Sequence, residues 1–169
     1  NTVESGVNNR QVSFTYDVLN RLLSESETGV NPRTTAYTYD AVGNRLQKVD
    51  SISGTTQNNY DLQDRLLSSS TNSVVTTYAY DRSGQLLSEV TGADQSTYTY
   101  TADGKLSSAT VNSGGNSETV GYRYTGDGLR VSRISASGET RYLIDSNREY
   151  SEIAQEYSPA GVLLRQYIY

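Results

Sequence analysis

Residues 37–46 read Tyr37-Thr-Tyr-Asp-Ala-Val-Gly-Asn-Arg-Leu46, and this stretch decides the fold. Its two aromatic residues alternate with a threonine, so both rings project from the same face of a strand. Asp40 and Gly43 then interrupt the strand. An aspartate bonds a backbone N–H two residues on, and a glycine accepts the positive φ of a tight turn. Leu46 starts a second strand, so the stretch predicts a β-hairpin.

The same pattern recurs along the chain, which makes this a repeat protein. The second aromatic residue of each copy serves as its marker. These marker tyrosines are Tyr16, Tyr39, Tyr60, Tyr80, Tyr100, Tyr124 and Tyr157. The last gap is the longest, and we expect it to contain a degenerate unit around Tyr142, in Thr140-Arg-Tyr-Leu-Ile-Asp145.

Two further positions keep their distance from the marker. An aliphatic residue follows six or seven positions later, at Leu22, Leu46, Leu66, Leu86, Leu106, Val131 and Leu163. The turn residues between them are Asp17, Asp40, Asp61 and Asp81 directly after the marker, then Gly43, Gly84, Gly104, Gly128 and Gly161. Asn20 and Asp64 stand where the other units have glycine, so we expect them at positive φ despite the steric cost. These residues form a repeat signature that we interpret as structural.

A single hairpin is marginally stable in water, so the hairpins must stack side by side. This predicts an all-β fold, a curved antiparallel sheet of tandem β-hairpins about 20 residues each. One face would carry the Tyr and Leu side chains, and the other Ser, Thr, Gln and charged residues. The first and last strands would have unpaired edges, which predicts self-association through them.

Composition limits the chemistry. The chain has no His and no Cys, which excludes a Ser-His-Asp triad, a Cys nucleophile, a His/Cys zinc site and a disulfide. Its net charge of -5 argues against binding nucleic acid or an anionic membrane surface. No apolar run approaches the length of a membrane-spanning helix, so we expect no membrane insertion. Only 34% of the residues are hydrophobic, but the many strand-forming residues argue against disorder.

Three functional interpretations compete with the structural one. The row of aspartates could bind calcium, although calcium sites need several converging carboxylates and each unit offers one. Carboxylate pairs such as Asp61 with Asp64, or Glu25 with Glu27, could serve a glycosidase, but nothing distinguishes them from polar surface. The tyrosines could stack on sugars, which leaves glycan binding open. We predict no catalytic residue, no metal and no cofactor, and therefore no enzyme.

Several of the copies resemble a known repeat. Tyr39-Asp-Ala-Val-Gly-Asn-Arg-Leu46 resembles the full-length YD repeat of Rhs (rearrangement hotspot) proteins. The segments that start at Tyr16, Tyr60 and Tyr80 resemble its shorter variant, and the resemblance covers about 14–169. Later units replace the aspartate by Thr101, Thr125 and Ser158, which favours a role for it in the turn.

The resemblance implies a spiralling β-sheet that forms a hollow shell. In Tc-toxin C-components and polymorphic toxins such a shell encloses a toxic domain, and in teneurin-like proteins it takes part in adhesion. It thus implies a bacterial secreted or surface protein in which residues 1–169 are one YD-repeat region of seven to eight hairpins, a fragment of a longer shell. Partners would be the remaining shell segments and a cargo domain. The alternative is an adhesion module that binds glycan or protein.

Family toxins also carry an Asp-Pro self-cleavage element. The two prolines here follow Asn31 and Ser158, so we expect no such core.

Overall fold

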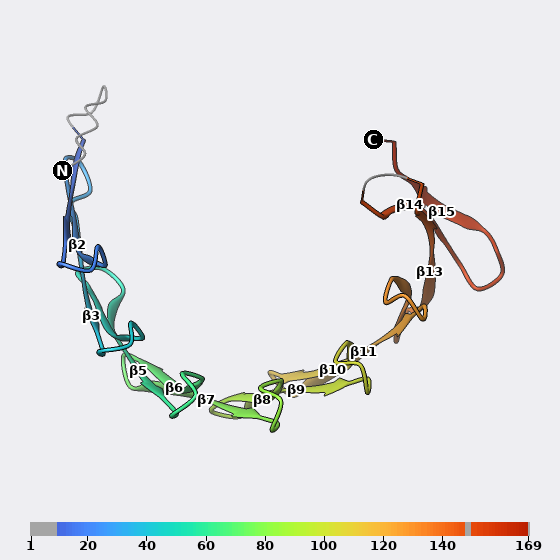
Figure 1. Cartoon of the computed structure of the whole chain (residues 1–169), viewed down its shortest axis with the longest axis horizontal. Coiled ribbons are helices and arrows are strands. Elements are labelled where there is room, and N and C mark those ends of the chain that lie inside the picture. Colours follow the sequence, from blue (N-terminus) through green and yellow to red (C-terminus); the bar gives the residue numbers. More distant parts are fainter. Residues whose placement is uncertain (1–9, 148–149, 169) are drawn as a thin grey trace. The chain divides into compact units, whose positions relative to one another are not determined.

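The computed structural model describes residues 10–147 and 150–168, and every regular element in these ranges is a β-strand. Within each of its two compact parts, each strand pairs antiparallel with the next along the chain, and Figure 1 shows this series of hairpins. The predicted all-β fold of tandem antiparallel hairpins is therefore confirmed. The chain divides into two compact units, residues 1–78 and 79–169, which we describe separately.

The first unit contains the strands of three hairpins and most of a seventh strand. They are β1 (Gln11–Tyr16), β2 (Leu22–Thr28), β3 (Arg33–Tyr39), β4 (Arg45–Asp50), β5 (Gly54–Tyr60), β6 (Leu66–Thr71) and β7 (Val74–Tyr80). The second unit contains β8 (Leu86–Thr91), β9 (Asp94–Tyr100), β10 (Leu106–Ser113), β11 (Asn116–Tyr124), β12 (Arg130–Ser135), β13 (Gly138–Asp145), β14 (Glu152–Tyr157) and β15 (Leu163–Gln166).

A β-bulge follows the tight turns whose strand pairing is described in each unit. Tyr39 pairs with Arg45, whereas the preceding Thr38 pairs with Gln47, so Leu46 is the extra residue of a bulge. Val131 is the extra residue in the same way, because Tyr124 pairs with Arg130. The expectation that Leu46 and Val131 are equivalent to Leu22 is wrong, since Leu22 is itself the partner of Tyr16. The six-residue units have the same bulge, with Leu23 and Leu67 as the extra residues. The seven-residue spacing therefore arises because an arginine takes the paired position in these two units and the aliphatic residue is the bulged one.

The register between consecutive hairpins is constant. The third residue of each second strand pairs with the residue three positions before the next marker. The pairs are Ser24 with Ala36, Gln47 with Gln57, Ser68 with Thr77, Ser88 with Thr97, and Ser108 with Gly121. The next pair in the series, Ser132 with Arg141, places Ile144 where a marker tyrosine would stand.

The last hairpin differs from the expected series. β13 contains Tyr142 and pairs with β14, so the degenerate unit around Tyr142 exists, and β14 is its second strand. Tyr157 therefore ends a strand that runs opposite to the strands that end at Tyr100 and Tyr124, and the turn after Tyr157 lies on the opposite side of this unit from the turns after Tyr100 and Tyr124. Tyr157 pairs with Arg141, the neighbour of Tyr142. Because side chains alternate along a strand, Tyr157 lies on the face opposite Tyr142.

The charges of the first unit lie on an unexpected face. We call the side that carries the marker tyrosines the tyrosine face and the other the hydroxyl face. The pairing places six charged side chains of the strands on the tyrosine face: Glu25, Glu27, Arg33, Arg45, Lys48 and Asp50. The paired hydroxyl-face positions of this unit, such as Thr15, Ser24 and Thr38, are uncharged. The prediction that the charges share the polar face is therefore wrong for this unit, whereas in the second unit the pairing does place Arg123, Glu139 and Arg141 on the hydroxyl face.

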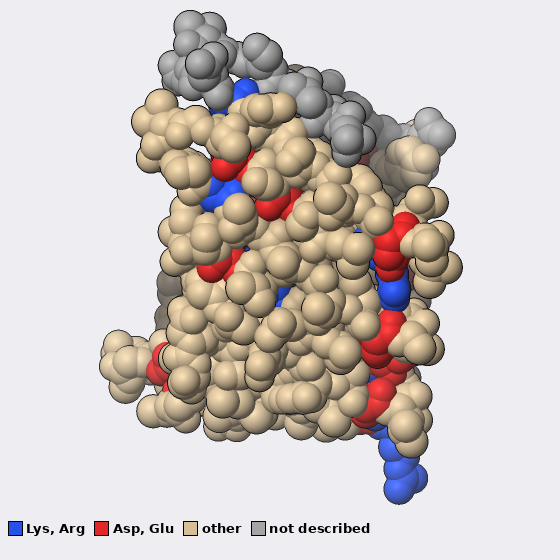
Figure 2. Space-filling model, turned by 90° about the vertical axis from the view of Figure 1, so that its left-hand side faces the viewer, with Lys and Arg blue, Asp and Glu red and all other residues tan. Residues whose placement is uncertain are grey.

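The reason is that the tyrosine face is not a dry core. Among the described residues, Val12 is the one buried hydrophobic residue, at 8% exposure, and no large side chain is fully buried. Arginines lie over tyrosine rings instead, with the Arg21 guanidinium 5.0 Å from the centre of the Tyr39 ring. In Figure 2 acidic and basic groups lie beside one another down the right side and again at the upper left, and most of that view is uncharged.

Candidate functional site

The aspartates after the marker tyrosines cap the tight turns. Asp17 Oδ1 accepts hydrogen bonds from the backbone N–H of Leu19 and of Arg21, each at 2.9 Å. Its Oδ2 accepts from Arg21 Nε at 2.6 Å. Asp61 repeats this geometry with Arg65, whose backbone N–H is the main cause that holds the pKa of Asp61 below its usual value. The aspartate thus stabilises a turn, as an Asx-turn does.

The threonine and serine residues that replace aspartate also cap the turn. Thr101, Thr125 and Ser158 each accept a hydrogen bond from the backbone N–H four residues on, at 2.9, 3.1 and 3.2 Å respectively. A hydroxyl oxygen thus satisfies the N–H that closes the turn without any charge. The described residues contain no group of three or more His, Cys, Asp or Glu side chains that could hold a metal ion.

The turns also confirm the expected backbone conformations of the two non-glycine residues. Asn20 has φ of 60° and Asp64 has φ of 61°, where Gly84 has 85° and Gly104 has 83°. All four donate their N–H back to the carbonyl of the first turn residue. Asparagine and aspartate tolerate this left-handed region better than other residues with a Cβ.

Asp61→Thr tests the capping role through its pH dependence. A lowered pKa contributes stability that is present above the unfolded-state value and is lost as the pH falls through the folded value, over ~pH 5 to 1. The variant keeps a capping oxygen but no charge, so its thermal midpoint at pH 7 should fall, and its midpoint should vary less in acid. Thr101→Asp is the matched reverse change and should make the midpoint more acid-sensitive. Equal pH profiles for Asp61→Thr and the unmodified chain would contradict the assignment.

The hydroxyls of four marker tyrosines join a hairpin to the one before it. Each of these four donates a hydrogen bond to the backbone carbonyl of the first residue in the preceding second strand, whereas the Tyr157 hydroxyl donates to the Gln155 side chain in its own strand. These latch tyrosines are Tyr39 to Leu22 at 2.8 Å, Tyr60 to Arg45 at 3.1 Å, Tyr100 to Leu86 at 2.9 Å and Tyr124 to Leu106 at 2.9 Å. Sequence reasoning missed this role. The signal was that every marker is Tyr rather than Phe.

Side chains at the end of one turn reach the next turn. Arg21 Nη1 donates to the backbone carbonyl of Asp40 at 2.8 Å. Asn44 Nδ2 donates to Asp64 Oδ1 at 2.7 Å, and Gln85 Nε2 donates to the carbonyl of Gly104 at 3.1 Å. Near the tight turns, neighbouring hairpins are therefore joined by two kinds of hydrogen bond. A latch tyrosine bonds the preceding hairpin, and the side chains named here bond the following turn.

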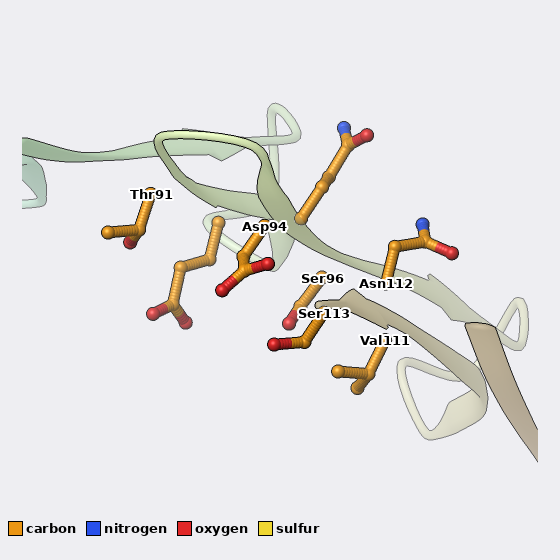
Figure 3. A pocket seen from close by; sticks show the side chains of 8 residues that line it. Thr91, Asp94, Ser96, Val111, Asn112 and Ser113 are labelled. Carbon is orange, nitrogen blue, oxygen red and sulfur yellow. The ribbon is translucent and has the colours of Figure 1, made fainter. Parts of the chain in front are cut away.

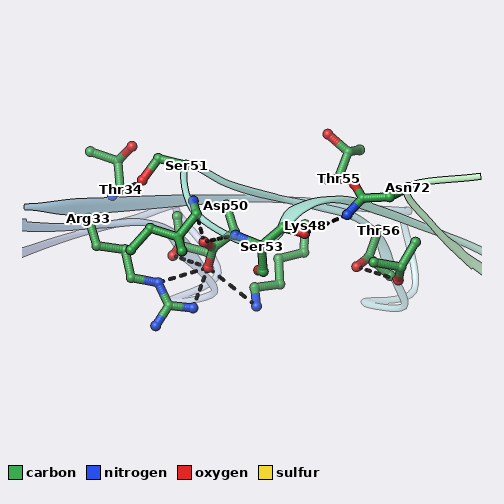
Figure 4. A network of polar contacts seen from close by, with 12 residues as sticks. Arg33, Thr34, Lys48, Asp50, Ser51, Ser53, Thr55, Thr56 and Asn72 are labelled. Atoms are coloured by element: carbon green, nitrogen blue, oxygen red, sulfur yellow. Dashed lines mark hydrogen bonds and ion pairs between the residues drawn. The ribbon is translucent and has the colours of Figure 1, made fainter.

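At the strand ends opposite the tight turns of the first unit, a network of polar contacts surrounds Asp50 (Figure 4). Asp50 is 2% exposed. Its carboxylate accepts from Arg33 Nε at 2.9 Å and from the Arg33 Nη2 group. The backbone N–H groups of Ile52 and Ser53 donate to Oδ1 at 2.9 and 3.0 Å. The Arg33 hydrogen bond, followed by these N–H groups, holds the pKa of Asp50 far below its usual range. Lys48 Nζ adds an ion pair at 3.5 Å.

The next connection along this edge holds Asn72 in a second polar contact (Figure 4). Asn72 Nδ2 donates to the carbonyl of Ser53 at 2.9 Å, and its Oδ1 accepts from the N–H of Thr55 at 3.3 Å. The amide lies so close to Gly54 that a Cβ there would overlap it, and Gly54 has φ of 87°. A glycine is therefore required by both the space and the backbone.

The carboxylates considered for catalysis are not brought together in a pocket. Asp61 and Asp64 belong to one turn, in which the N–H of Asp64 bonds the carbonyl of Asp61. A different pair, Glu89 and Asp94, lines an open hollow of about 220 Å³ in the second unit. Figure 3 shows Asp94, Val111 and Ser113 on one side of the ribbon there, with Asn112 on the other. Asp94 Oδ1 accepts from the N–H of Gly114 at 3.0 Å, which is a structural contact.

Within the part of the chain that the structure describes, no helix is long and apolar enough to cross a membrane. The capping aspartates lie in hairpin turns, and the latch tyrosines lie at junctions between hairpins. The geometry of the described residues supplies turn capping and hairpin-to-hairpin hydrogen bonds, and the acidic pair at the hollow described above, Glu89 and Asp94, lies in an open site.

The chain is similar to proteins among known families and among solved structures. No curated protein matches the sequence. Among solved structures, the crystal structure of TcdB2-TccC3-TEV is similar at 13% identity, with a TM-score of 0.37 over 94% of this chain. The crystal structure of TcdB2-TccC3-Cdc42 is similar at 14% identity, with a TM-score of 0.35. The chain spans 13% of the length of each of these chains. Residues 1–169 match the family described as Teneurin YD-shell, so the chain belongs to the teneurin YD-shell family.

Proposed function

We propose that this chain is a non-catalytic structural segment of a secreted or cell-surface YD-shell protein. In that protein, residues 1–169 form one YD-repeat region, and its hairpins continue into the remaining shell segments to enclose a cargo domain. The polypeptides it contacts are those segments and the cargo. Membership of the YD-shell family supports the structural role.

One observation carries the proposal: the repeated polar groups are engaged between hairpins. The latch tyrosines bond carbonyl groups of the preceding hairpin, and residues such as Arg21 and Asn44 bond the following turn. Each hairpin is thus held by its two neighbours, which is how repeat proteins gain stability. A wall built in this way needs no single deep core, in agreement with the sparse burial among the described residues.

The test uses the complete polypeptide in which this chain occurs. In that protein, Tyr39→Phe and Tyr60→Phe together should loosen the wall and open protease sites outside residues 1–169. The controls are Tyr98→Phe and Tyr122→Phe, at the first aromatic position, where no hydroxyl hydrogen bond is present. If the latch variant shows faster amide exchange in its hairpins but an unchanged digestion pattern elsewhere, the enclosure of a cargo is wrong.

The non-catalytic part has its own test at the hollow lined by Glu89 and Asp94. We expect no turnover of glycan or peptide substrates by the chain. A hydrolytic rate that Asp94→Asn abolishes, while the thermal midpoint stays unchanged, would establish an enzyme instead.

A further inference from the structure

One unit of the second half contains the repeat motif without its latch tyrosine. In Tyr142-Leu-Ile-Asp145, Ile144 stands at the marker position that the constant register defines. The rest of the motif is in place. Tyr142 lies on the same face as Tyr122, and Asp145 Oδ1 accepts from the N–H of Asn147 at 3.0 Å. The unit therefore retains the local geometry of a marker but lacks the ring and the hydroxyl.

Because Ile144 replaces the tyrosine, the backbone carbonyl of Arg130, the first residue of β12, lacks the hydroxyl donor found at the other junctions. At the equivalent place in the first unit, Arg45 also begins a second strand, and Tyr60 donates its hydroxyl to the Arg45 carbonyl at 3.1 Å. Ile144 has no donor to offer. Among the described residues, no tyrosine hydroxyl reaches the carbonyl of Arg130. The Arg45 junction shows that a tyrosine fits beside an arginine at this position.

A hollow of about 250 Å³ remains where the acceptor and the missing ring would meet. Its lining is Tyr124, Leu129, Arg130, Ile144, Ser151 and Ile153. Three of these side chains are aliphatic, one is a tyrosine, and Arg130 contributes the acceptor strand. The Arg130 guanidinium itself is held between two rings, 5.4 Å from the centre of Tyr122 and 5.5 Å from that of Tyr142. One lining residue of the hollow, Arg130, is thus held in place by contacts with two rings.

We propose that this hollow is an open tyrosine socket, which binds the side chain of a tyrosine supplied by another polypeptide segment. The ring packs against Ile144 and Ile153, and its hydroxyl donates a hydrogen bond to the carbonyl of Arg130. The occupant follows from the four filled junctions of the same chain, where a tyrosine on a neighbouring strand occupies this position. The site goes beyond the proposed structural role, because it would bind a polypeptide segment other than the hairpins described here.

The chemistry of the socket selects a phenol. A phenylalanine ring would bury similar apolar area but would leave the carbonyl acceptor without a donor, and burying an unpaired polar group is costly. A charged side chain would have to lose its hydration against Ile144, Ile153 and Leu129. The socket should therefore prefer tyrosine over phenylalanine, and the difference in binding measures the hydrogen bond.

The test titrates the whole chain with N-acetyl-L-tyrosinamide and follows backbone amide shifts. We expect saturable shifts at Leu129, Arg130 and Ile153, with at least a threefold weaker response to N-acetyl-L-phenylalaninamide. Ile144→Tyr should fill the socket from within, abolish these shifts and raise the thermal midpoint. Ile144→Phe should also block binding but raise the midpoint less.

Tyr100→Ile provides an independent check, because it removes the donor to the Leu86 carbonyl, and so should open an equivalent socket at Leu86 and create a second set of saturable shifts there. It also keeps the test decisive if Ile144→Tyr does not fold. The proposal is overturned if the unmodified chain shows no saturable shifts at 129–130 and 153, or if the two amides bind equally. Unchanged binding by Ile144→Phe would overturn it as well.

Discussion

Asp50→Ala should lower the thermal midpoint of the hairpins in the first unit markedly at pH 7. The substitution removes a carboxylate whose side chain is 0% exposed and which pairs with Arg33 and Lys48. It also leaves the N–H groups of Ile52 and Ser53 without their acceptor. Breaking one partner of a buried network costs more than the network's net contribution, because the remaining groups stay desolvated.

The same variant should flatten the response to acid. The pKa of Asp50 is held far below its usual range by Arg33, so the stability it contributes is present above the unfolded-state pKa of ~4. That contribution is lost progressively as the pH falls below this value. The midpoints of the variant and the unmodified chain should therefore converge in acid. The measurement is a set of thermal scans by circular dichroism between neutral pH and strong acid.

Asp127→Ala is the matched control, since Asp127 is an exposed turn residue with no hydrogen bond in the structure. It should leave the midpoint at pH 7 nearly unchanged, as surface substitutions usually do. A midpoint for Asp50→Ala as high as that of Asp127→Ala would show that the network does not stabilise the edge.

The paired latch variant Tyr100→Phe with Tyr124→Phe should destabilise the second unit by about 2 kcal/mol, from about 1 kcal/mol for each hydrogen bond. Each substitution keeps the ring and removes only the hydroxyl that reaches Leu86 or Leu106. The carbonyl acceptors lie at strand starts beside a turn, so partial access of water limits the loss. Urea unfolding followed by tyrosine fluorescence and circular dichroism measures the change.

Tyr98→Phe with Tyr122→Phe is the control for this pair, because the same number of hydroxyls is removed from the first aromatic position. Neither Tyr98 nor Tyr122 donates a hydroxyl hydrogen bond in the structure, so this variant should lose less than half as much stability. Amide exchange should rise at the β8–β9 and β10–β11 junctions only in the latch variant. Equal losses in the two double variants would mean that ring packing, and not the latch, joins the hairpins.

Much of the architecture was predictable because its determinants are local. The alternation in Tyr37-Thr-Tyr39 requires a strand, and the residues after it form a turn whose geometry depends on a few backbone angles. Asn20 and Asp64 were predicted at positive φ for the same reason, and their φ values of 60° and 61° confirm it. The aspartate caps follow from hydrogen bonds between residues two to four positions apart.

The misassigned positions depend on how strands pair. Whether Leu46 or Arg45 faces Tyr39 is decided by a bulge, which the seven-residue spacing alone does not locate. The placement of charges on the tyrosine face depends on Arg33 meeting Asp50 across two strands. Tyr157 looks like a marker in sequence, but β14 was already paired as the second strand of the β13 hairpin.

The sequence by itself determined the repeating hairpin and the family resemblance, because both rest on residue types at fixed spacing within about 20 positions. The tertiary structure alone decided what joins one hairpin to the next. Three features show this: the hydrogen bond from Tyr39 to Leu22, the network at Asp50 and the hollow beside Ile144. Each of them involves residues from different strands. Such contacts depend on register, which is set by the pairing of whole strands rather than by any single residue.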